Sequence, residues 1–283
     1  MNQNQIIFLF VLSAFLAHPI LKAQEPVSPN GKFTNVHGAK IYYEEYGEGE
    51  PLILLHGFGR TASDWQFFIP DLSKHYRVIA WDMRGHGRST NPDTSVVFHH
   101  AVAAQDLLSL MDILKIEKAK VIGHSSGGII ILYAATMQPE RFDAIVPISA
   151  QMYFSSQTRE FIKENAKPES YYKFNDGEKL HGKLKGMLIA NQFYNFHKLK
   201  GDPAITPDQL ATIKARTLII HGDNDFVPVA QAWEMFNSIP NAHLNIVPNG
   251  WHLPQNGPLN GADFLRRTLE FLKGDWNEGF SPK

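Results

Sequence analysis

Cysteine is absent from all 283 residues of this sequence. A chain without cysteine forms no disulfide bond, offers no thiolate to zinc and carries no thiol for lipid attachment. Its folded state therefore has to be stabilised by core packing. Hydrophobic residues make up 43% of the chain and charged residues 19%, which is the composition of a globular protein with a sizeable core.

An excess of charge of one sign is absent as well. The formal net charge is −1, and no cluster of Lys and Arg stands out along the chain. Binding to nucleic acid needs a basic patch, so we do not expect a nucleic-acid partner. The sequence also lacks a His-x-x-x-His pattern, and no Gly-x-Gly-x-x-Gly opens a helix after the first expected strand. We therefore expect neither a metal nor a nucleotide cofactor.

A long apolar run stands at the N-terminus. No charged side chain precedes Lys22, and the run from Ile6 to Ala17 is interrupted only by Ser13. The run is short for a bilayer span but has the length of a signal-peptide core, and Ala23 is a small residue of the kind that precedes cleavage. We expect residues 1–23 to be removed and the mature chain to be exported, periplasmic or secreted, without stable membrane insertion. The match to a signal peptide is imperfect, because no basic residue precedes the run and Leu21 is large for its position before the cleavage site. An uncleaved anchor and an ordinary cytosolic N-terminus are the alternatives.

Beyond residue 31, short apolar runs alternate with stretches of helical spacing. Such alternation predicts an α/β fold with a mostly parallel sheet and helices on both faces. His37, Gly38 and Ala39 indicate the turn of an N-terminal hairpin, and Ser63 or Asp64 is expected to cap a helix. Eight strands are expected at 33–36, 40–46, 51–55, 77–81, 120–122, 143–148, 216–220 and 243–247, and helices at 98–114, 129–137, 228–238 and 262–272.

The stretch 151–215 interrupts this alternation. It contains no convincing buried strand, is rich in Phe, Tyr and Lys, and has helix-like spacing around 158–166 and 178–196. A structureless loop of that length is improbable inside a compact domain. We therefore expect a helical lid at 151–215, inserted between the two parts of one core at 24–150 and 216–283.

A serine flanked by glycines lies where an expected strand passes into an expected helix, in Gly123-His124-Ser125-Ser126-Gly127. In the pattern Gly-x-Ser-x-Gly, the glycines permit a sharp turn that leaves the serine Oγ exposed at its tip. The pattern also arises by chance, so its meaning depends on its surroundings. A catalytic serine needs a base, a group that orients the base, and N–H donors for the developing oxyanion.

Candidates for the base and the acid follow the last two expected strands. His252, in Asn249-Gly250-Trp251-His252, can reach over the sheet edge to Ser125. Asp225 follows the strand 216–220 and is the expected acid. Asp223 is its rival, although an aspartate in a tight loop often serves the turn by bonding its own backbone. The loop after the preceding strand contains no carboxylate that could replace them.

The expected oxyanion donors are backbone N–H groups. One belongs to Ser126, and the other to Phe58 in His56-Gly57-Phe58-Gly59, where glycines let the chain approach the site closely. A simple glycine-rich turn is the alternative for this loop. Arg84 and Arg88, in the polar turn after the strand 77–81, are interpreted as structural rather than as a phosphate or carboxylate site. We interpret the histidines of these motifs, His56, His86 and His124, as structural too.

Together these motifs resemble the α/β-hydrolase family in its lid-bearing, serine esterase-like branch, over residues 33–272 apart from the lid. The resemblance implies that Ser125 attacks a carbonyl with His252 as base, while Asp225 orients the histidine. It further implies an acyl-enzyme, with its oxyanion bound by the N–H groups of Phe58 and Ser126. Serine at position 125 sets aside the epoxide hydrolases and dehalogenases that look alike but use aspartate there.

The resemblance implies a carboxylesterase acting on small-molecule esters without a cofactor. The aromatic residues of the lid favour apolar or aromatic substrates. Two alternatives stay open. The same triad serves hydrolysis of C–C bonds, lactones or amides, and a receptor of this fold can keep the triad while turning over little ligand.

Overall fold

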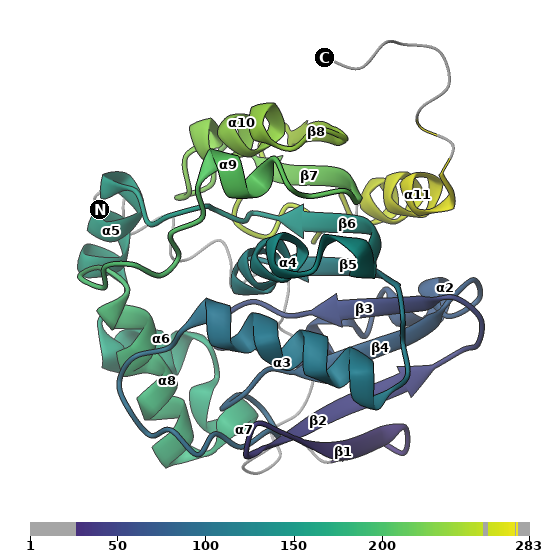
Figure 1. Ribbon diagram of the computed structural model, residues 1–283. Coiled ribbons are helices and arrows are strands. Elements are labelled where there is room, and N and C mark those ends of the chain that lie inside the picture. Colours follow the sequence, from purple (N-terminus) through teal and green to yellow (C-terminus); the bar gives the residue numbers. More distant parts are fainter. Residues whose placement is uncertain (1–26, 257–259, 275, 277–283) are drawn as a thin grey trace.

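The computed structural model describes residues 27–256, 260–274 and 276 (Figure 1). The expected signal peptide at 1–23 lies outside them. Within the described part of the chain, no helix is both long enough and apolar enough to cross a membrane.

Eight strands form one sheet in the order β1-β2-β4-β3-β5-β6-β7-β8. They are β1 (Gly31–Val36), β2 (Ala39–Tyr46), β3 (Pro51–Leu55), β4 (Arg77–Asp82), β5 (Ala119–His124), β6 (Phe142–Ile148), β7 (Arg216–Gly222) and β8 (Ala242–Val247). Strand β2 pairs antiparallel with β1 and β4, and the pairs from β4 through β3 to β8 are parallel. The expectation of an eight-stranded, mostly parallel sheet is confirmed.

Helices cover both faces of this sheet. One apolar cluster includes residues of α3 (His100–Ile113), α4 (Ser126–Met137) and α10 (Val229–Ser238); the other includes residues of η1 (Ala62–Trp65), α2 (Ile69–Leu72) and α11 (Asn260–Lys273). A short helix, η2 (Pro139–Arg141), joins α4 to β6.

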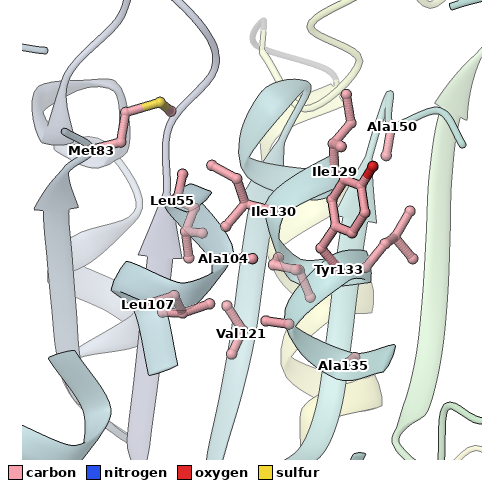
Figure 2. Packing of buried hydrophobic residues seen from close by; sticks show 14 of the residues in the cluster. Leu55, Met83, Ala104, Leu107, Val121, Ile129, Ile130, Tyr133, Ala135 and Ala150 are labelled. Atoms are coloured by element: carbon pink, nitrogen blue, oxygen red, sulfur yellow. The ribbon is translucent and has the colours of Figure 1, made fainter. Parts of the chain in front are cut away.

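Strand β3 contributes alternate side chains to the two clusters. Its residues Ile53 and Leu55 belong to the first and Leu52 and Leu54 to the second, because successive strand side chains point to opposite faces. Figure 2 shows Leu55 and Val121 packed against residues of α3 and α4 such as Leu107 and Ile130.

Two local expectations differ from the structure. The hairpin turn contains only His37 and Gly38, both at positive φ (45° and 76°), and Ala39 already pairs in β2. Neither Ser63 nor Asp64 caps a helix, so that prediction is wrong; both lie inside η1, whose Ala62 N–H donates to Asp82 Oδ1 at 2.8 Å. The cap comes from the end of β4, and Asp64 binds Arg60 instead.

Between β6 and β7, the chain leaves the sheet and forms α5 (Ser156–Asn165), α6 (Pro168–Phe174), α7 (Gly177–His181), α8 (Lys183–Asn195) and α9 (Pro207–Leu210). We call residues 151–215 the inserted segment. The helix expected at 178–196 is divided at Gly182, whose φ of 78° ends α7. In Figure 1, α5 to α8 lie beyond the ends toward which β3, β5 and β6 point.

Candidate active site

Ser125 stands at the turn between β5 and α4 in a backbone conformation that side chains rarely adopt. Its φ is 53° and its ψ −117°, and its N–H donates to Ile148 O at 2.8 Å. Neighbouring backbone leaves no space for side chains at the flanking glycines. A Cβ on Gly123 would lie 2.6 Å from the carbonyl carbon of Gly127, and one on Gly127 would lie 2.5 Å from Leu55 O. This strained turn holds the Ser125 hydroxyl at the carboxyl edge of the sheet.

His252 joins Ser125 to Asp225. Its Nε2 lies 2.9 Å from Ser125 Oγ, and its Nδ1 lies 2.8 Å and 3.0 Å from the two carboxylate oxygens of Asp225. Because an ionised carboxylate only accepts hydrogen bonds, the neutral imidazole carries its proton on Nδ1 and turns a lone pair on Nε2 toward the serine. A base that takes the Oγ proton needs this arrangement.

The structure places Asp225, and not Asp223, beside the histidine. Asp225 is buried and accepts a further bond from Val227 N–H at 3.0 Å, whereas Asp223 is exposed and accepts the Gly250 N–H at 3.1 Å. Burial alone would raise the pKa of Asp225, but the adjacent His252 and the Val227 N–H hold that pKa below its ordinary value. Asp225 therefore stays ionised, and Asp223 serves the turn.

The N–H groups of Phe58 and Ser126 border this serine. A Cβ on Gly57 would lie 2.7 Å from His124 Nδ1 and 3.5 Å from Ser125 Cβ, so the loop meets the turn at a distance that only glycine permits. Across the described residues, neither N–H has a hydrogen-bond acceptor. Both are thus available to an oxygen bound at Ser125.

Side chains of the inserted segment hold the loop that carries Phe58. The Tyr171 hydroxyl donates to Phe58 O at 2.9 Å, and His181 Nε2 lies 3.0 Å from Gly59 O. The phenyl ring of Phe58 packs edge-on against Phe196, with ring centroids 5.0 Å apart. These contacts join residues more than a hundred positions apart, and no local sequence pattern indicates them.

His124, which the sequence indicates only as a structural residue, contacts the backbone of His252. It is 5% exposed, and its Nε2 lies 2.6 Å from the backbone oxygen of His252. Burial, followed by the nearby His252, lowers the pKa of His124 to about 3, so the imidazole stays neutral and donates through Nε2. His124 therefore fixes the backbone of the residue that faces Ser125.

An aromatic ring packs against the imidazole of His252, and a second ring stacks on the first. Phe226 lies 4.3 Å from the imidazole between ring centroids, and Phe161 of α5 stacks on Phe226 at 4.3 Å with an interplanar angle of 5°. Tyr153, another aromatic residue of the inserted segment, is exposed, and its hydroxyl donates to the Glu234 carboxylate. The site thus borders an aromatic surface to which the inserted segment contributes.

The two arginines of the turn after β4 bind carboxylates of the protein. Arg88 binds Asp82, with Nε 2.8 Å from Oδ2, and Arg84 binds Asp106, with Nη2 2.7 Å from Oδ1. These buried pairs agree with the structural interpretation. In the described ranges, no three His, Cys, Asp or Glu side chains are grouped to hold a metal ion.

A cavity of about 640 Å³ lies at the opposite edge of the sheet, and Glu50, Lys120 and Arg216 are three of the residues that line it. These residues stand at the beginnings of parallel strands or just before them. Ligands of open α/β sheets bind outside the carboxyl ends of the strands. This rule favours the edge that carries Ser125 over the cavity as the place of the chemistry.

Comparisons with known proteins agree with this fold. A family model described as alpha/beta hydrolase fold matches residues 50–181. The chain is 27% identical over 273 residues to 2-hydroxy-6-oxo-6-(2'-aminophenyl)hexa-2,4-dienoic acid hydrolase of Metapseudomonas resinovorans, covering 85% of this chain and 90% of that protein. It is 32% identical over 141 residues to an epoxide hydrolase of Caballeronia sordidicola, covering 49% of this chain and 43% of that protein.

A solved structure extends the similarity to three dimensions. The meta-cleavage product hydrolase of Pseudomonas fluorescens IP01 superposes with a TM-score of 0.67 at 27% identity, covering 86% of this chain and 97% of that one. Sheet order, strand-to-helix turn and sequence similarity lead to the same assignment. The chain belongs to the alpha/beta hydrolase fold family.

Proposed function

We propose that this serine hydrolase acts through an acyl-enzyme at Ser125 on a small molecule with an aryl or other apolar group on its reactive carbonyl. The hydrogen-bonded chain Ser125–His252–Asp225 is the observation that carries the proposal. Ser125 Oγ attacks the carbonyl carbon while its proton moves to His252 Nε2. The N–H groups of Phe58 and Ser126 bind the resulting oxyanion.

The second half of the cycle reverses the proton transfer. His252 gives its proton to the leaving atom as the bond to the acyl carbon breaks. It then removes a proton from the water that attacks the acyl-enzyme, and it returns that proton to Ser125 Oγ as the bond between Oγ and the acyl carbon breaks. Asp225 keeps the imidazole in one tautomer throughout. The leaving atom is carbon in the hydrolysis of a C–C bond and oxygen in the hydrolysis of an ester.

Hydrolysis of a C–C bond is the first candidate for the reaction. The Metapseudomonas relative is named for a six-carbon dienoic acid with an aminophenyl ketone, and the Pseudomonas structure for a meta-cleavage product. An aryl ketone would fit beside the aromatic ring of Phe226, which lies next to His252 and is stacked on Phe161. We therefore place C–C bond hydrolysis, one of the alternatives left open by the sequence, ahead of the carboxylesterase that the resemblance implied.

Ester hydrolysis is the second candidate, and a charge pair near the site favours it. Arg60 follows the oxyanion loop directly, and its guanidinium binds the Asp64 carboxylate, with Nη2 2.7 Å from Oδ1. A dienoic acid brings a carboxylate that needs a cationic partner when it is desolvated. Asp64 already neutralises the charge of Arg60, so this pair offers a substrate carboxylate no net positive charge. An uncharged ester needs no cationic partner.

One pair of substrates separates the candidates. 2-Hydroxy-6-oxo-6-phenylhexa-2,4-dienoic acid and p-nitrophenyl benzoate both deliver a benzoyl group to Ser125, and they differ in the leaving group and in the bond broken. We expect a higher kcat/KM for the dienoic acid. A higher kcat/KM for the ester would support the second candidate.

Ser125→Ala is the matched control. We expect it to lower kcat by at least ~10³-fold on whichever substrate is turned over, since triad members act as a unit. A fluorophosphonate probe should label the wild-type protein but not this variant. Labelling without turnover of either substrate would indicate a receptor, and an unlabelled wild-type protein would contradict the hydrolase itself.

We also propose that the mature protein is exported after removal of residues 1–23. The apolar run from Ile6 to Ala17, followed by Ala23, supports this proposal. Expression with a C-terminal tag in a bacterial host, followed by mass spectrometry, should give a periplasmic chain that begins at Gln24. A full-length chain in the cytosol would contradict export, and a full-length chain in the membrane fraction would indicate the uncleaved anchor.

A further inference from the structure

A second hydrogen-bonded Ser–His–Asp chain lies beside the first. His100 Nε2 lies 3.0 Å from Ser126 Oγ, and His100 Nδ1 lies 3.2 Å from Asp202 Oδ1. The other carboxylate oxygen of Asp202 accepts the backbone N–H of His100 at 2.6 Å. His100 is fully buried, and Ser126 and Asp202 are 4% and 5% exposed. The serine of this chain directly follows Ser125.

The partners fix the direction of these hydrogen bonds. The carboxylate of Asp202 only accepts, so a neutral His100 carries its proton on Nδ1 and accepts the Ser126 O–H at Nε2. Asp202 also caps the N-terminal end of α3, because its carboxylate accepts the N–H of His100, the first residue of the helix. The side chain of His99, the N-cap residue, makes no such bond. One carboxylate of the inserted segment therefore holds both the backbone and the side chain of His100.

The surroundings of His100 are apolar. Its ring lies 5.3 Å from Phe98, 6.1 Å from Phe154 and 5.3 Å from Phe196, measured between ring centroids. A polar group buried there costs free energy unless all its partners are present, and the chain from Asp202 to Ser126 supplies them. The arrangement leaves the Ser126 hydroxyl with one defined partner in a rigid setting.

We propose that Asp202 and His100 are positioning residues for the oxyanion hole, acting through the side chain of Ser126. This inference rests on the proposed function, in which the Ser126 N–H is an oxyanion donor. Ser126 is the first residue of α4. Its hydroxyl is attached through a single CH₂ group to the Cα that follows its N–H, so the position of one affects the position of the other. Anchoring Oγ on His100 restricts the rotation of the peptide that carries this N–H.

The inserted segment thereby holds both oxyanion donors. Asp202, between α8 and α9, acts on Ser126 through His100, while Tyr171 and His181 hold the backbone oxygens of Phe58 and Gly59. Displacement of the segment would disturb both donors together. Its role accordingly includes assembly of the catalytic geometry as well as cover of the site.

The test uses Ser126→Ala, which removes the hydroxyl but keeps the N–H. Loss of a whole oxyanion donor costs about 10²- to 10³-fold in kcat, so misalignment of one should cost less, about tenfold. With p-nitrophenyl acetate we expect kcat to fall about tenfold and KM to stay within about twofold. The rate of fluorophosphonate labelling, which places a phosphonyl oxygen in the same hole, should fall by a similar factor.

His100→Leu should reproduce this loss, and the double variant should lose no more than the worse single variant, because one chain of contacts is broken. His100→Gln, whose amide oxygen can accept the Ser126 O–H, should recover part of the activity. Thr136→Val is the matched control, since it removes a hydrogen-bonded hydroxyl from the other end of α4. It should leave kcat and labelling unchanged.

The outcomes of this test are distinct. A wild-type protein that reacts with the probe, together with a Ser126→Ala protein of equal labelling rate and kcat, would overturn the positioning role while leaving the hydrolase intact. A rise in KM at constant kcat would likewise contradict it. If His100→Leu does not fold, Ser126→Ala decides alone, because it removes a single oxygen atom.

Discussion

At the scale of single residues, the two aspartates after β7 show how position alone separates the proposed catalytic acid from a turn former. Asp223 is exposed and its carboxylate accepts a loop N–H, whereas Asp225, two residues later, is buried against His252. The chemistry of the two side chains is identical. Their different environments place only Asp225 against His252, the proposed base.

Asp225→Asn tests this assignment. An amide at this position donates to His252 Nδ1, which forces the imidazole into the tautomer that cannot accept the Ser125 proton. We expect kcat to fall by about 10³- to 10⁴-fold, which is less than the effect of Ser125→Ala. Asp223→Asn retains an oxygen for the Gly250 N–H and should leave kcat within about threefold. If Asp225→Asn were silent and Asp223→Asn were not, Asp223 would be the acid.

At the scale of elements, the turn between β5 and α4 depends on how closely α4 approaches β3. The first turn of α4 lies against the last carbonyl groups of that strand, and Gly127 is the point of contact. Glycine here is a requirement of packing between elements rather than of the φ angle, because Gly127 lies inside the helix.

Gly127→Ala should therefore disrupt the turn. The added Cβ would lie 2.5 Å from Leu55 O and 2.8 Å from His56 O, and backbone atoms cannot yield as a flexible side chain does. We expect loss of activity and a decrease of about 2 kcal/mol or more in the free energy of unfolding, within the usual cost of overpacking. Urea denaturation and fluorophosphonate labelling measure these effects.

Gly261→Ala is the control for Gly127→Ala. Its nearest neighbour is Gln255 O at 3.6 Å, and alanine is the better helix former, so α11 should be unaffected or slightly more stable. Wild-type stability and activity in Gly127→Ala would show that α4 can move away from β3.

At the scale of the whole molecule, buried histidines make stability dependent on pH. Burial lowers the pKa of His124 to about 3 and of His181 to about 4, and it also lowers the pKa of His56, His86 and His221. In the unfolded chain these groups bind protons near pH 6.5. Below that pH, the unfolded state therefore binds more protons than the folded state, and acid favours unfolding.

The free energy of unfolding should consequently fall as the pH decreases from about 6.5 toward 4. Between pH 6 and pH 5, His124 and His181 alone should lower it by about 2 kcal/mol, since each missing proton costs about 1.4 kcal/mol per pH unit. Urea denaturation at pH 7, 6 and 5 measures the slope. His181→Gln should reduce the slope, and replacement of the exposed His75 by Gln should not. Equal stability at pH 7 and pH 5 would contradict the assignment.

By itself, the sequence determined the features that depend on neighbours along the chain. Alternating apolar runs predict the strands of the sheet, and glycine spacing around Ser125 predicts the sharp turn. The positions of Ser125, Asp225 and His252 after three of the parallel strands, β5, β7 and β8, also follow from local pattern, because parallel strands end at one edge. The helix cap expected from Ser63 or Asp64 was wrong because Asp82, eighteen or more residues away, supplies the partner.

Only the tertiary structure decided which groups meet across the fold. Tyr171 reaches Phe58 over 113 positions of sequence, and Asp202 reaches His100 over 102. Contacts of this kind arise when packing of the inserted segment against the core removes water from polar groups, which must then pair with whatever donor or acceptor faces them. Burial and pairing are properties of the assembled molecule. They distinguish Asp225 from Asp223, and they give the Ser126 hydroxyl its partner, His100.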